Sequence, residues 1–399
     1  MAEKVRNYFR SFREAPGARY IDVLDGIRAL CIFLVGWYHI WQQSWLSPSF
    51  VIGKEYISLD FLLRSGYLWV DGMLLLSGFL LFLPYTQAES KMPSALAFYK
   101  RRLIRILPSY LLCVIPLFIL AFSQGKYGSV MDAVKDLAAH LTFTHTLFPF
   151  SYTGSPINGA LWTLGVEMQF YLLFPLLARC YRKKPVLTYI VMAAAAFAYR
   201  YWVGANVRDT TLYINQLPAF LDVYANGFAA ASIFAALRKK LGGEIDGKIK
   251  LLFTVAAVVC VCLLMQIARA QAASPSYEAI RQGQMDRRFS LTATLSCLMV
   301  CCAFSLSGLR FLLGNHIMRF LSAVSFQFYM YHQWLAVKLK EWNVVPASSA
   351  TPWSQSDRHW QISYTVLCFV AALLLAALIT YLFEKPIARA LRKKTKAEG

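Results

Sequence analysis

The chain alternates between long apolar segments and short polar connections over nearly its whole length. Runs such as Ile27–Ile40, Leu103–Phe122, Leu251–Ile267 and Val366–Phe383 carry few or no charges, and a helix needs roughly 20 mostly apolar residues to cross a bilayer. The pattern predicts an all-α, polytopic membrane helical bundle of about ten transmembrane helices. The expected spans are 22–44, 67–86, 103–123, 159–180, 186–204, 215–237, 249–270, 289–307, 319–340 and 362–384.

Composition supports the same fold class, because 58% of the residues are hydrophobic and only 16% are charged. A soluble protein needs more polar surface than this. The formal net charge of +20 does not indicate nucleic-acid binding, since the basic residues form short clusters between apolar runs. With ten spans every cluster falls on one side, so the positive-inside rule predicts cytoplasmic N- and C-termini. The clusters are 6–19, 100–105, 179–184, 238–250, 310–319 and 385–396.

The domain division follows from these spans. We expect a cytosolic basic N-terminal tail at 1–21, a membrane domain at 22–386 and a cytosolic basic C-terminal tail at 387–399. The N-terminal segment lacks the apolar core and cleavage site of a secretory signal, so we expect it to stay attached. The nine cysteines lie in or at the ends of apolar runs, so we expect small core residues, with no disulfide and no metal site.

The outward connections are expected at 45–66, 124–158, 205–214, 271–288 and 341–361. The second is long enough to do more than connect helices. Within it, Met131–Leu147 is amphipathic and is predicted to lie in the membrane interface or to dip back into the bundle. We expect its two histidines, His140 and His145, to be solvated.

Ionisable residues inside spans mark the candidate chemistry, because each costs roughly 2.5–3.5 kcal/mol to insert. They occur in the first, second, third, fourth and ninth expected spans. The candidates are Asp25, Arg28, His39, Asp71, Arg102, Arg105, Glu167 and His332.

Arg28 and His39 share one helix face, since 11 residues at about 100° each return to nearly the same direction after roughly 16.5 Å of rise. Guanidinium groups bind phosphate in a bidentate manner, and imidazole is a general base near neutral pH. A long molecule with an anionic head and a reactive tail matches this pair. An acyl-coenzyme A has that form.

Glu167 is expected at a depth close to that of His39, because its helix runs in the opposite direction. We therefore expect the carboxylate to orient the imidazole of a catalytic His39. Arg102 and Arg105 lie one turn apart where the third span begins. We expect both to bind the phosphates of the donor together with Arg28.

The order and spacing of several short motifs resemble those of the acyltransferase 3 family of integral membrane acyltransferases over nearly the whole chain. The first is Leu24–Arg28, followed after ten residues by His39. The others are Val70–Gly72 with Leu76–Leu80, Phe98–Arg105 with Pro108, Leu161–Tyr171 with Pro175, Ser325–His332 and Glu384–Pro386.

The resemblance implies transfer of an acyl group, usually acetyl, from a cytosolic thioester to a hydroxyl, often on a carbohydrate at the outer face. Asp25, Asp71, Ser77, Trp162, Tyr331 and His332 belong to these motifs and are expected to support the site or the substrate. The chain departs from many relatives in having Met168 where they carry a second acidic residue. It also lacks the extracytoplasmic hydrolase-like domain of some members, so we do not expect a complete two-step transfer within this chain.

The function predicted from the sequence is therefore a membrane O-acyltransferase of the cell (plasma or inner) membrane. It moves an acyl group, most simply acetyl, from acyl-CoA to a hydroxyl of a carbohydrate or other cell-envelope acceptor, with His39 as general base. The expected partners are the donor, the acceptor and membrane lipid, without nucleic acid or metal. Direct transfer and an acyl-enzyme on Ser77 or His39 both fit the sequence, as do acetyl and succinyl groups.

The alternative is a proton-coupled or anion transporter that uses the same intramembrane charges. It predicts inverted repeats with broken helices in matching positions, and the sequence does not display them. A purely structural membrane partner would leave the shared face of Arg28 and His39 unexplained.

Overall fold

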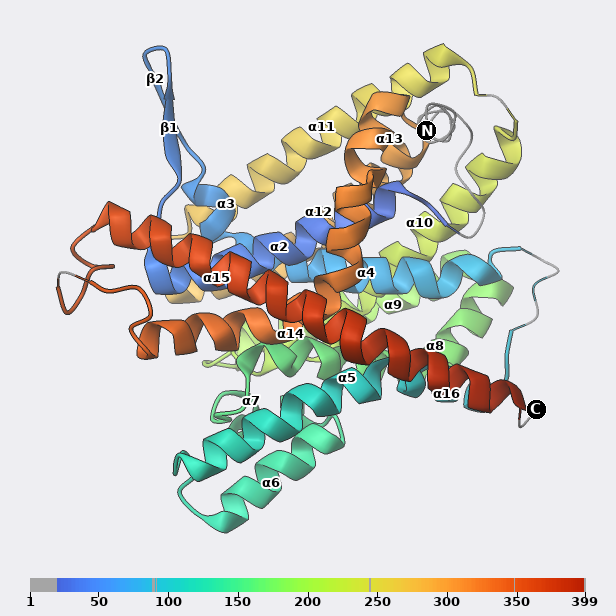
Figure 1. The fold of residues 1–399 in the computed structure, drawn as a ribbon. Helices are drawn as coiled ribbons and strands as arrows, with labels where there is room; N and C mark the ends of the chain where they lie inside the picture. Colours follow the sequence, from blue (N-terminus) through green and yellow to red (C-terminus); the bar gives the residue numbers. More distant parts are fainter. Residues whose placement is uncertain (1–19, 88–89, 91, 244, 348, 398–399) are drawn as a thin grey trace.

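Helices make up almost all of the structure (Figure 1). The computed structural model describes residues 20–87, 90, 92–243, 245–347 and 349–397, so most of the predicted N-terminal tail lies outside the described residues. Short 3₁₀ turns and one π-helical turn, Thr380–Glu384, join the longer elements. These are α2 (Val23–Ser44), β1 (Ser49–Ile52), β2 (Glu55–Ser58), α3 (Asp60–Arg64), α4 (Trp69–Phe82), α5 (Ala95–Ser123), α6 (Val130–Leu141), α7 (Pro149–Tyr152), α8 (Trp162–Lys183), α9 (Pro185–Asn206), α10 (Leu221–Lys240), α11 (Gly247–Ala272), α12 (Tyr277–Phe304), α13 (Ser307–Gly314), α14 (His316–Glu341), α15 (Arg358–Ile379) and α16 (Lys385–Ala397).

Nine helices in the described part of the chain are long and apolar enough to cross a membrane. They match every expected span except 319–340, which is part of α14. That helix has 26 residues, enough to span, but it carries buried polar side chains such as Ser322, Gln327 and His332. It packs against α2 and α15, so protein surrounds much of its polar surface. The predicted all-α membrane bundle is confirmed.

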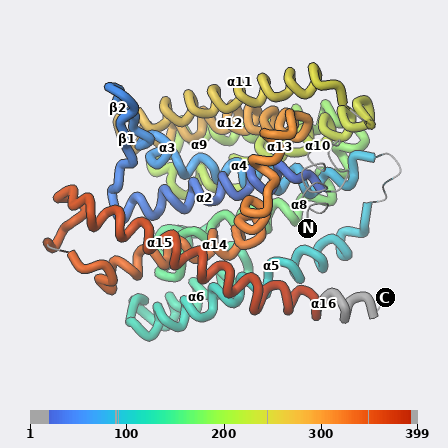
Figure 2. The backbone as a smooth tube through the Cα atoms, turned by 45° about the horizontal axis from the view of Figure 1, so that its top comes forward, coloured from blue at the N-terminus to red at the C-terminus, as the bar shows by residue number. Residues whose placement is uncertain are grey.

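The two ends of the described chain lie at the same end of the bundle. Figures 1 and 2 place the start of α2 and the C-terminal α16 at one end and the β1–β2 hairpin at the other. The segments 100–105, 179–184, 238–250 and 385–389 also lie at the end that holds α16. We call it the basic end and the opposite one the hairpin end. Arg28 lies near the basic end of α2, and His39 lies toward its hairpin end.

Helices α4 and α10 cross at very short range because both carry glycine at the crossing. A Cβ atom on Gly227 would lie 2.7 Å from the Leu75 carbonyl oxygen, and one on Gly78 would lie 3.1 Å from the Tyr224 carbonyl oxygen. Small residues permit this approach between membrane helices. The crossing fixes α4, which carries Ser77, against the interior of the bundle.

Buried ion pairs tie further helices together. Arg200 of α9 binds both carboxylate oxygens of Asp222 on α10, at 2.9 and 2.7 Å. Arg288 of α12 donates to Asp71 of α4 at 3.2 Å and to the carbonyl oxygens of Ile214 and Ala219.

A third pair involves a residue predicted to belong to a basic surface cluster. Arg310 of α13 is instead only 4% exposed and donates to Asp22, the residue before α2, at 2.8 Å. All three guanidinium groups are thus neutralised where solvent is scarce.

The segment 124–158 forms a packed cap rather than a solvated loop. Its amphipathic stretch begins as α6, which packs against α5 and α7. His140 and His145 are 1% and 2% exposed, and their rings stack with centroids 4.4 Å apart. The prediction that they are solvated is wrong. His140 Nδ1 donates to the Asp136 backbone carbonyl at 2.9 Å, and His145 Nε2 donates to the Leu161 carbonyl at 3.0 Å.

The Arg288–Asp71 pair provides a test of this packing. Arg288→Met should lower the free energy of unfolding by about 3–5 kcal/mol, because Asp71 would be left buried without its cation. Thermal unfolding in detergent measures the loss. The double variant Asp71→Asn/Arg288→Met should recover much of it, and an unchanged single variant would contradict a structural role.

The buried His145 predicts a pH dependence. Burial and the neighbouring His140 hold the pKa of His145 at about 3, against 6.5 for an ordinary histidine. The unfolded chain therefore binds a proton that the folded chain excludes, so stability is complete above pH 6.5 and falls as the pH drops toward 3. The loss at pH 5 should be about 2 kcal/mol.

Unfolding temperatures at pH 7 and pH 5 measure this loss. His145→Gln should show a smaller difference between the two values. Equal differences in the variant and the unaltered protein would refute the assignment.

Candidate active site

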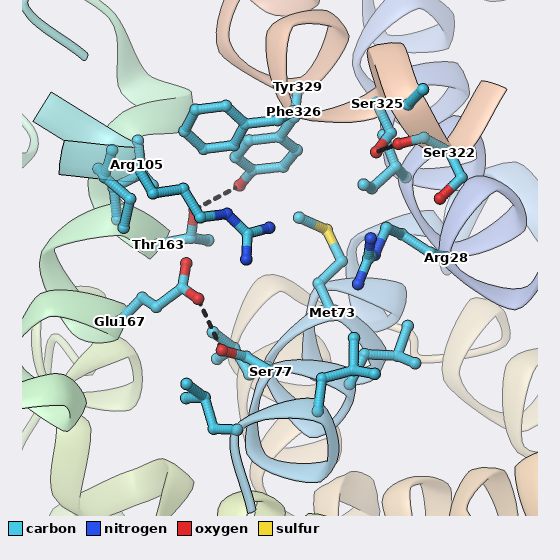
Figure 3. Close-up of a pocket in the computed structure, with 18 of the residues that line it drawn as sticks. Arg28, Met73, Ser77, Arg105, Thr163, Glu167, Ser322, Ser325, Phe326 and Tyr329 are labelled. Carbon is cyan, nitrogen blue, oxygen red and sulfur yellow. Dashed lines mark hydrogen bonds between the residues drawn. The ribbon is translucent and has the colours of Figure 1, made fainter. Parts of the chain in front are cut away.

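A cavity of about 540 Å³ lies among α2, α4, α5, α8 and α14 (Figure 3). Its lining includes Arg102, Arg105 and Lys385, which belong to segments at the basic end. Its wall combines apolar side chains, such as Met73 and Phe326, with a small set of polar and charged groups. This is the usual composition of a small-molecule site. The polar groups used below are Asp25, Arg28, Ser77, Arg102, Arg105, Thr163, Glu167, Tyr171, Tyr329 and Glu384.

Three arginines that the sequence singled out converge on this cavity. Arg28 comes from α2, and Arg102 and Arg105 come from the first turns of α5. Arg102 lies over the rings of Phe98 and Tyr171, 5.4 and 5.7 Å from their centroids. Neither Arg28 nor Arg105 forms a hydrogen bond or ion pair with any residue that the structure describes, and Figure 3 shows both guanidinium groups directed into the cavity. The cavity therefore presents two positive charges that no hydrogen bond or ion pair with a described residue satisfies.

The acidic groups of the cavity are already engaged by hydrogen bonds. Asp25 accepts from Tyr20 at 2.5 Å and from Ser322 at 2.7 Å. Glu384 accepts from Gln327 at 2.7 Å. These contacts hold the carboxylates in the wall and leave the arginine side chains to face the interior.

Glu167 belongs to this cavity and does not pair with His39 as the sequence suggested. Its Oε1 atom accepts from Ser77 at 2.6 Å and from the Tyr171 hydroxyl. Equal depth did not imply contact, because Glu167 points from α8 toward α4 and α5, whereas His39 points from α2 toward α14. The arginine-lined cavity, which contains Glu167, is therefore separate from the site around His39.

His39 is held by residues of its own helix. The Gln42 amide donates to the Tyr38 hydroxyl at 2.9 Å, which turns its carbonyl oxygen toward His39 Nδ1 at 3.1 Å. His39 therefore carries its proton on Nδ1 and keeps a lone pair on Nε2. That nitrogen has no hydrogen-bond partner within the described ranges, so it is available as a base.

His332 of α14 lies beside His39, with ring centroids 5.2 Å apart. Its Nδ1 atom donates to the Tyr329 carbonyl at 2.8 Å, and its buried Nε2 atom has no partner among the described atoms. The Tyr329 ring lies 5.6 Å from His332 and also lines the arginine cavity, where its hydroxyl accepts from Thr163 at 3.0 Å. A row of rings thus leads from the cavity to His39.

The remaining sequence candidates lie outside the cavity wall. Asp71 is bound to Arg288, as described above. Trp162 lies near Phe220, with ring centroids 6.0 Å apart. Tyr331 donates to the Leu112 carbonyl at 3.2 Å. These three side chains support the packing of helices around the site.

Several residues of the site were not assigned a role from the sequence. Gln42 and Tyr171 follow His39 and Glu167 by three and four positions, a spacing that places side chains together on a helix, so that signal was present. Tyr329, Thr163 and Glu384 lie within the motifs quoted above. They come from separate elements, and nothing local indicated that they would meet in one cavity. No group of three or more His, Cys, Asp or Glu side chains in the described residues has a metal-binding arrangement, and the nine cysteines are free.

Together, the helical bundle and its internal, arginine-lined cavity define a polytopic membrane protein with a positively charged internal cavity. Residues 21–384 match the family model described as an acyltransferase domain. The chain belongs to this acyltransferase family and is therefore an acyltransferase, as its motifs predicted.

Individual relatives are more distant. "O-acetyltransferase OatA" of Staphylococcus aureus is 27% identical over 241 residues, which cover 53% of this chain and 36% of that protein. "Putative peptidoglycan O-acetyltransferase YrhL" of Bacillus subtilis is 24% identical over 92% of this chain and 55% of that protein. "Acyltransferase MdmB" of Streptomyces mycarofaciens is 30% identical over 43% of this chain and 42% of that protein. The matched regions thus span about a third to a little over half of these relatives, and no solved structure matches the chain.

The charge of the cavity predicts opposite effects for two substitutions. Glu167→Gln should raise the affinity for inorganic pyrophosphate several-fold, because it removes a negative charge near Arg28 while keeping an oxygen that accepts from Ser77. Arg105→Gln should lower that affinity by about tenfold, the loss of one charge-assisted hydrogen bond. Calorimetric titration of purified protein measures both. A fall in both variants would mean that Glu167 maintains the shape of the cavity rather than its charge.

Proposed function

We propose that the chain transfers an acyl group, in the first place acetyl, from acyl-CoA to a hydroxyl of a carbohydrate or other cell-envelope acceptor. His39 is the general base, and Arg28, Arg102 and Arg105 bind the phosphates of the donor. The protein is a multi-pass protein of the plasma or inner membrane, with its basic end in the cytoplasm. The observation that carries the proposal is an imidazole with a fixed lone pair on the same helix as an arginine facing an anion-binding cavity.

The cavity supports a donor of this chemistry. Arginine is suited to bidentate binding of phosphate. Two of the three, Arg28 and Arg105, form no hydrogen bond or ion pair with a described residue that would compete for such a ligand. The apolar part of the wall, including Met73 and Phe326, suits an uncharged portion of the donor that extends toward Tyr329. The donor head would then lie at the basic end and its thioester deeper in the bundle.

The reaction at His39 follows from its tautomer. The acceptor oxygen forms a bond to the thioester carbonyl carbon while its proton passes to His39 Nε2. Collapse of the tetrahedral intermediate breaks the carbon–sulfur bond, and the thiolate takes the proton from the imidazolium. Gln42 keeps the Nδ1 proton in place throughout, which is the orienting role that the sequence assigned to a carboxylate.

The acceptor is proposed to approach from the hairpin end. His39 lies toward this end of α2, whereas the arginine cavity is lined by residues from segments at the other end. The Bacillus subtilis relative is named as a putative peptidoglycan O-acetyltransferase, which supports a glycan hydroxyl as acceptor for this chain.

His39→Ala tests the proposal directly. Turnover of radiolabelled acetyl-CoA by purified protein with an added glycan acceptor should fall about 100-fold or more, because the general base is removed. Gln42→Ala should lower kcat by a smaller factor and leave the donor KM unchanged. It removes the group that holds the His39 proton on Nδ1, but it leaves the arginines in place.

The exposed His359 provides the matched control. His359→Ala should keep full turnover. Retained turnover in His39→Ala would refute the assignment of the base.

A further inference from the structure

A second cavity of about 370 Å³ lies between α5 and α16 at the basic end. It shares three lining residues with the arginine cavity, namely Arg105, Glu384 and Lys385. Figure 2 shows α16 running beside the first part of α5, and the two helices are in contact. We call this second cavity the α5–α16 groove. A ligand in the arginine cavity can therefore extend past Arg105 into the groove.

The groove is strongly cationic. Its remaining wall consists of Arg101 and Ile104 from α5 and Ala388 and Arg389 from α16. Arg101 and Arg389 are exposed, and neither forms a hydrogen bond or ion pair with a residue described by the structure. The acid in the wall, Glu384, already accepts from Gln327. Two arginines on facing helices are thus left to bind an outside anion.

The turn before α16 shapes this wall. The chain leaves α15 through the π-helical turn Thr380–Glu384, and α16 begins at Lys385. A π-turn inserts an extra residue into the helical register, and such turns occur frequently at functional sites. Here the residues at its end, Glu384 and Lys385, line both cavities. The backbone irregularity therefore coincides with the junction between the two cavities.

Basic residues at a membrane surface also contact lipid headgroups without any specific ligand. Two observations favour a ligand that continues from the arginine cavity. Arg105 belongs to both walls, so a phosphate bound there lies at the entrance of the groove. The two exposed arginines come from opposite sides of one groove, which suits two-sided binding of a single phosphate.

We propose that the α5–α16 groove binds the nucleotide end of the donor, with Arg101 and Arg389 on its 3′-phosphate. This inference rests on the proposed function, since it extends the donor site to a further phosphate. Coenzyme A carries a pyrophosphate within the chain and a separate phosphate on the ribose 3′-oxygen. The arginine cavity takes the first and the groove takes the second, so α16 is a donor-recognition element.

The test compares acetyl-CoA with acetyl-3′-dephospho-CoA, which differ only in that phosphate. Steady-state turnover is measured in phosphatidylcholine nanodiscs, which exclude effects of anionic lipid. The unaltered protein should show a KM for the dephospho donor about tenfold or more above that for acetyl-CoA. Arg389→Gln and Arg101→Gln should each raise the KM for acetyl-CoA by about tenfold and leave the KM for the dephospho donor and kcat nearly unchanged.

Arg179 of α8 provides a matched control, because it is exposed at the same end and lines neither cavity. Arg179→Gln should preserve the preference for the phosphorylated donor. The inference would be overturned if Arg389→Gln raised the KM for both donors equally. It would also be overturned if the unaltered protein had the same KM for both. If neither donor is turned over, the proposed function fails. Calorimetric titration with CoA and with 3′-dephospho-CoA then still decides whether the groove binds the 3′-phosphate.

Discussion

The structure depends on one constraint: a charge within an apolar bundle must have a partner or face a space that a polar ligand or water can enter. The pairs Arg200–Asp222, Arg288–Asp71 and Arg310–Asp22 satisfy it internally. The last two join segments more than 200 positions apart in the sequence. Arg28 and Arg105 satisfy it in the other way, because they face a cavity. The same rule thus separates arginines that hold the bundle together from arginines that face the cavity.

The bundle was predictable from the sequence because a bilayer imposes a length and an apolar composition on each span. The convergence of Arg28, Arg102 and Arg105 was predictable for a related reason, since all three lie at one depth next to basic segments. The pairing of His39 with Glu167 was not. Depth along a helix can be counted from residues, whereas the rotation of two helices about their axes depends on contacts such as the Gly78–Gly227 crossing, which only the folded structure defines.

Other errors have the same physical origin. Asp71 looked functional because it is an acid inside a span, yet its partner Arg288 comes from a helix more than 200 positions later. Arg200 and Asp222 lay within two consecutive expected spans and were also overlooked as a pair. His140 and His145 looked solvated because they lie between spans, but α6 packs back on α5 and encloses them. By contrast, Gln42 follows His39 at helical spacing and could have been found from local geometry alone.

The polar character of α14 has a consequence for how the protein is made. This helix carries Ser325, Tyr329 and His332 into the interior and is the long helix that falls short of the apolarity expected of a membrane span. A segment of this kind partitions poorly into lipid by itself. Its stable insertion is therefore expected to depend on α2 and α15, the helices against which it packs. Because α15 follows α14 in the chain, the bundle around the cavity is complete only after both helices have been synthesised.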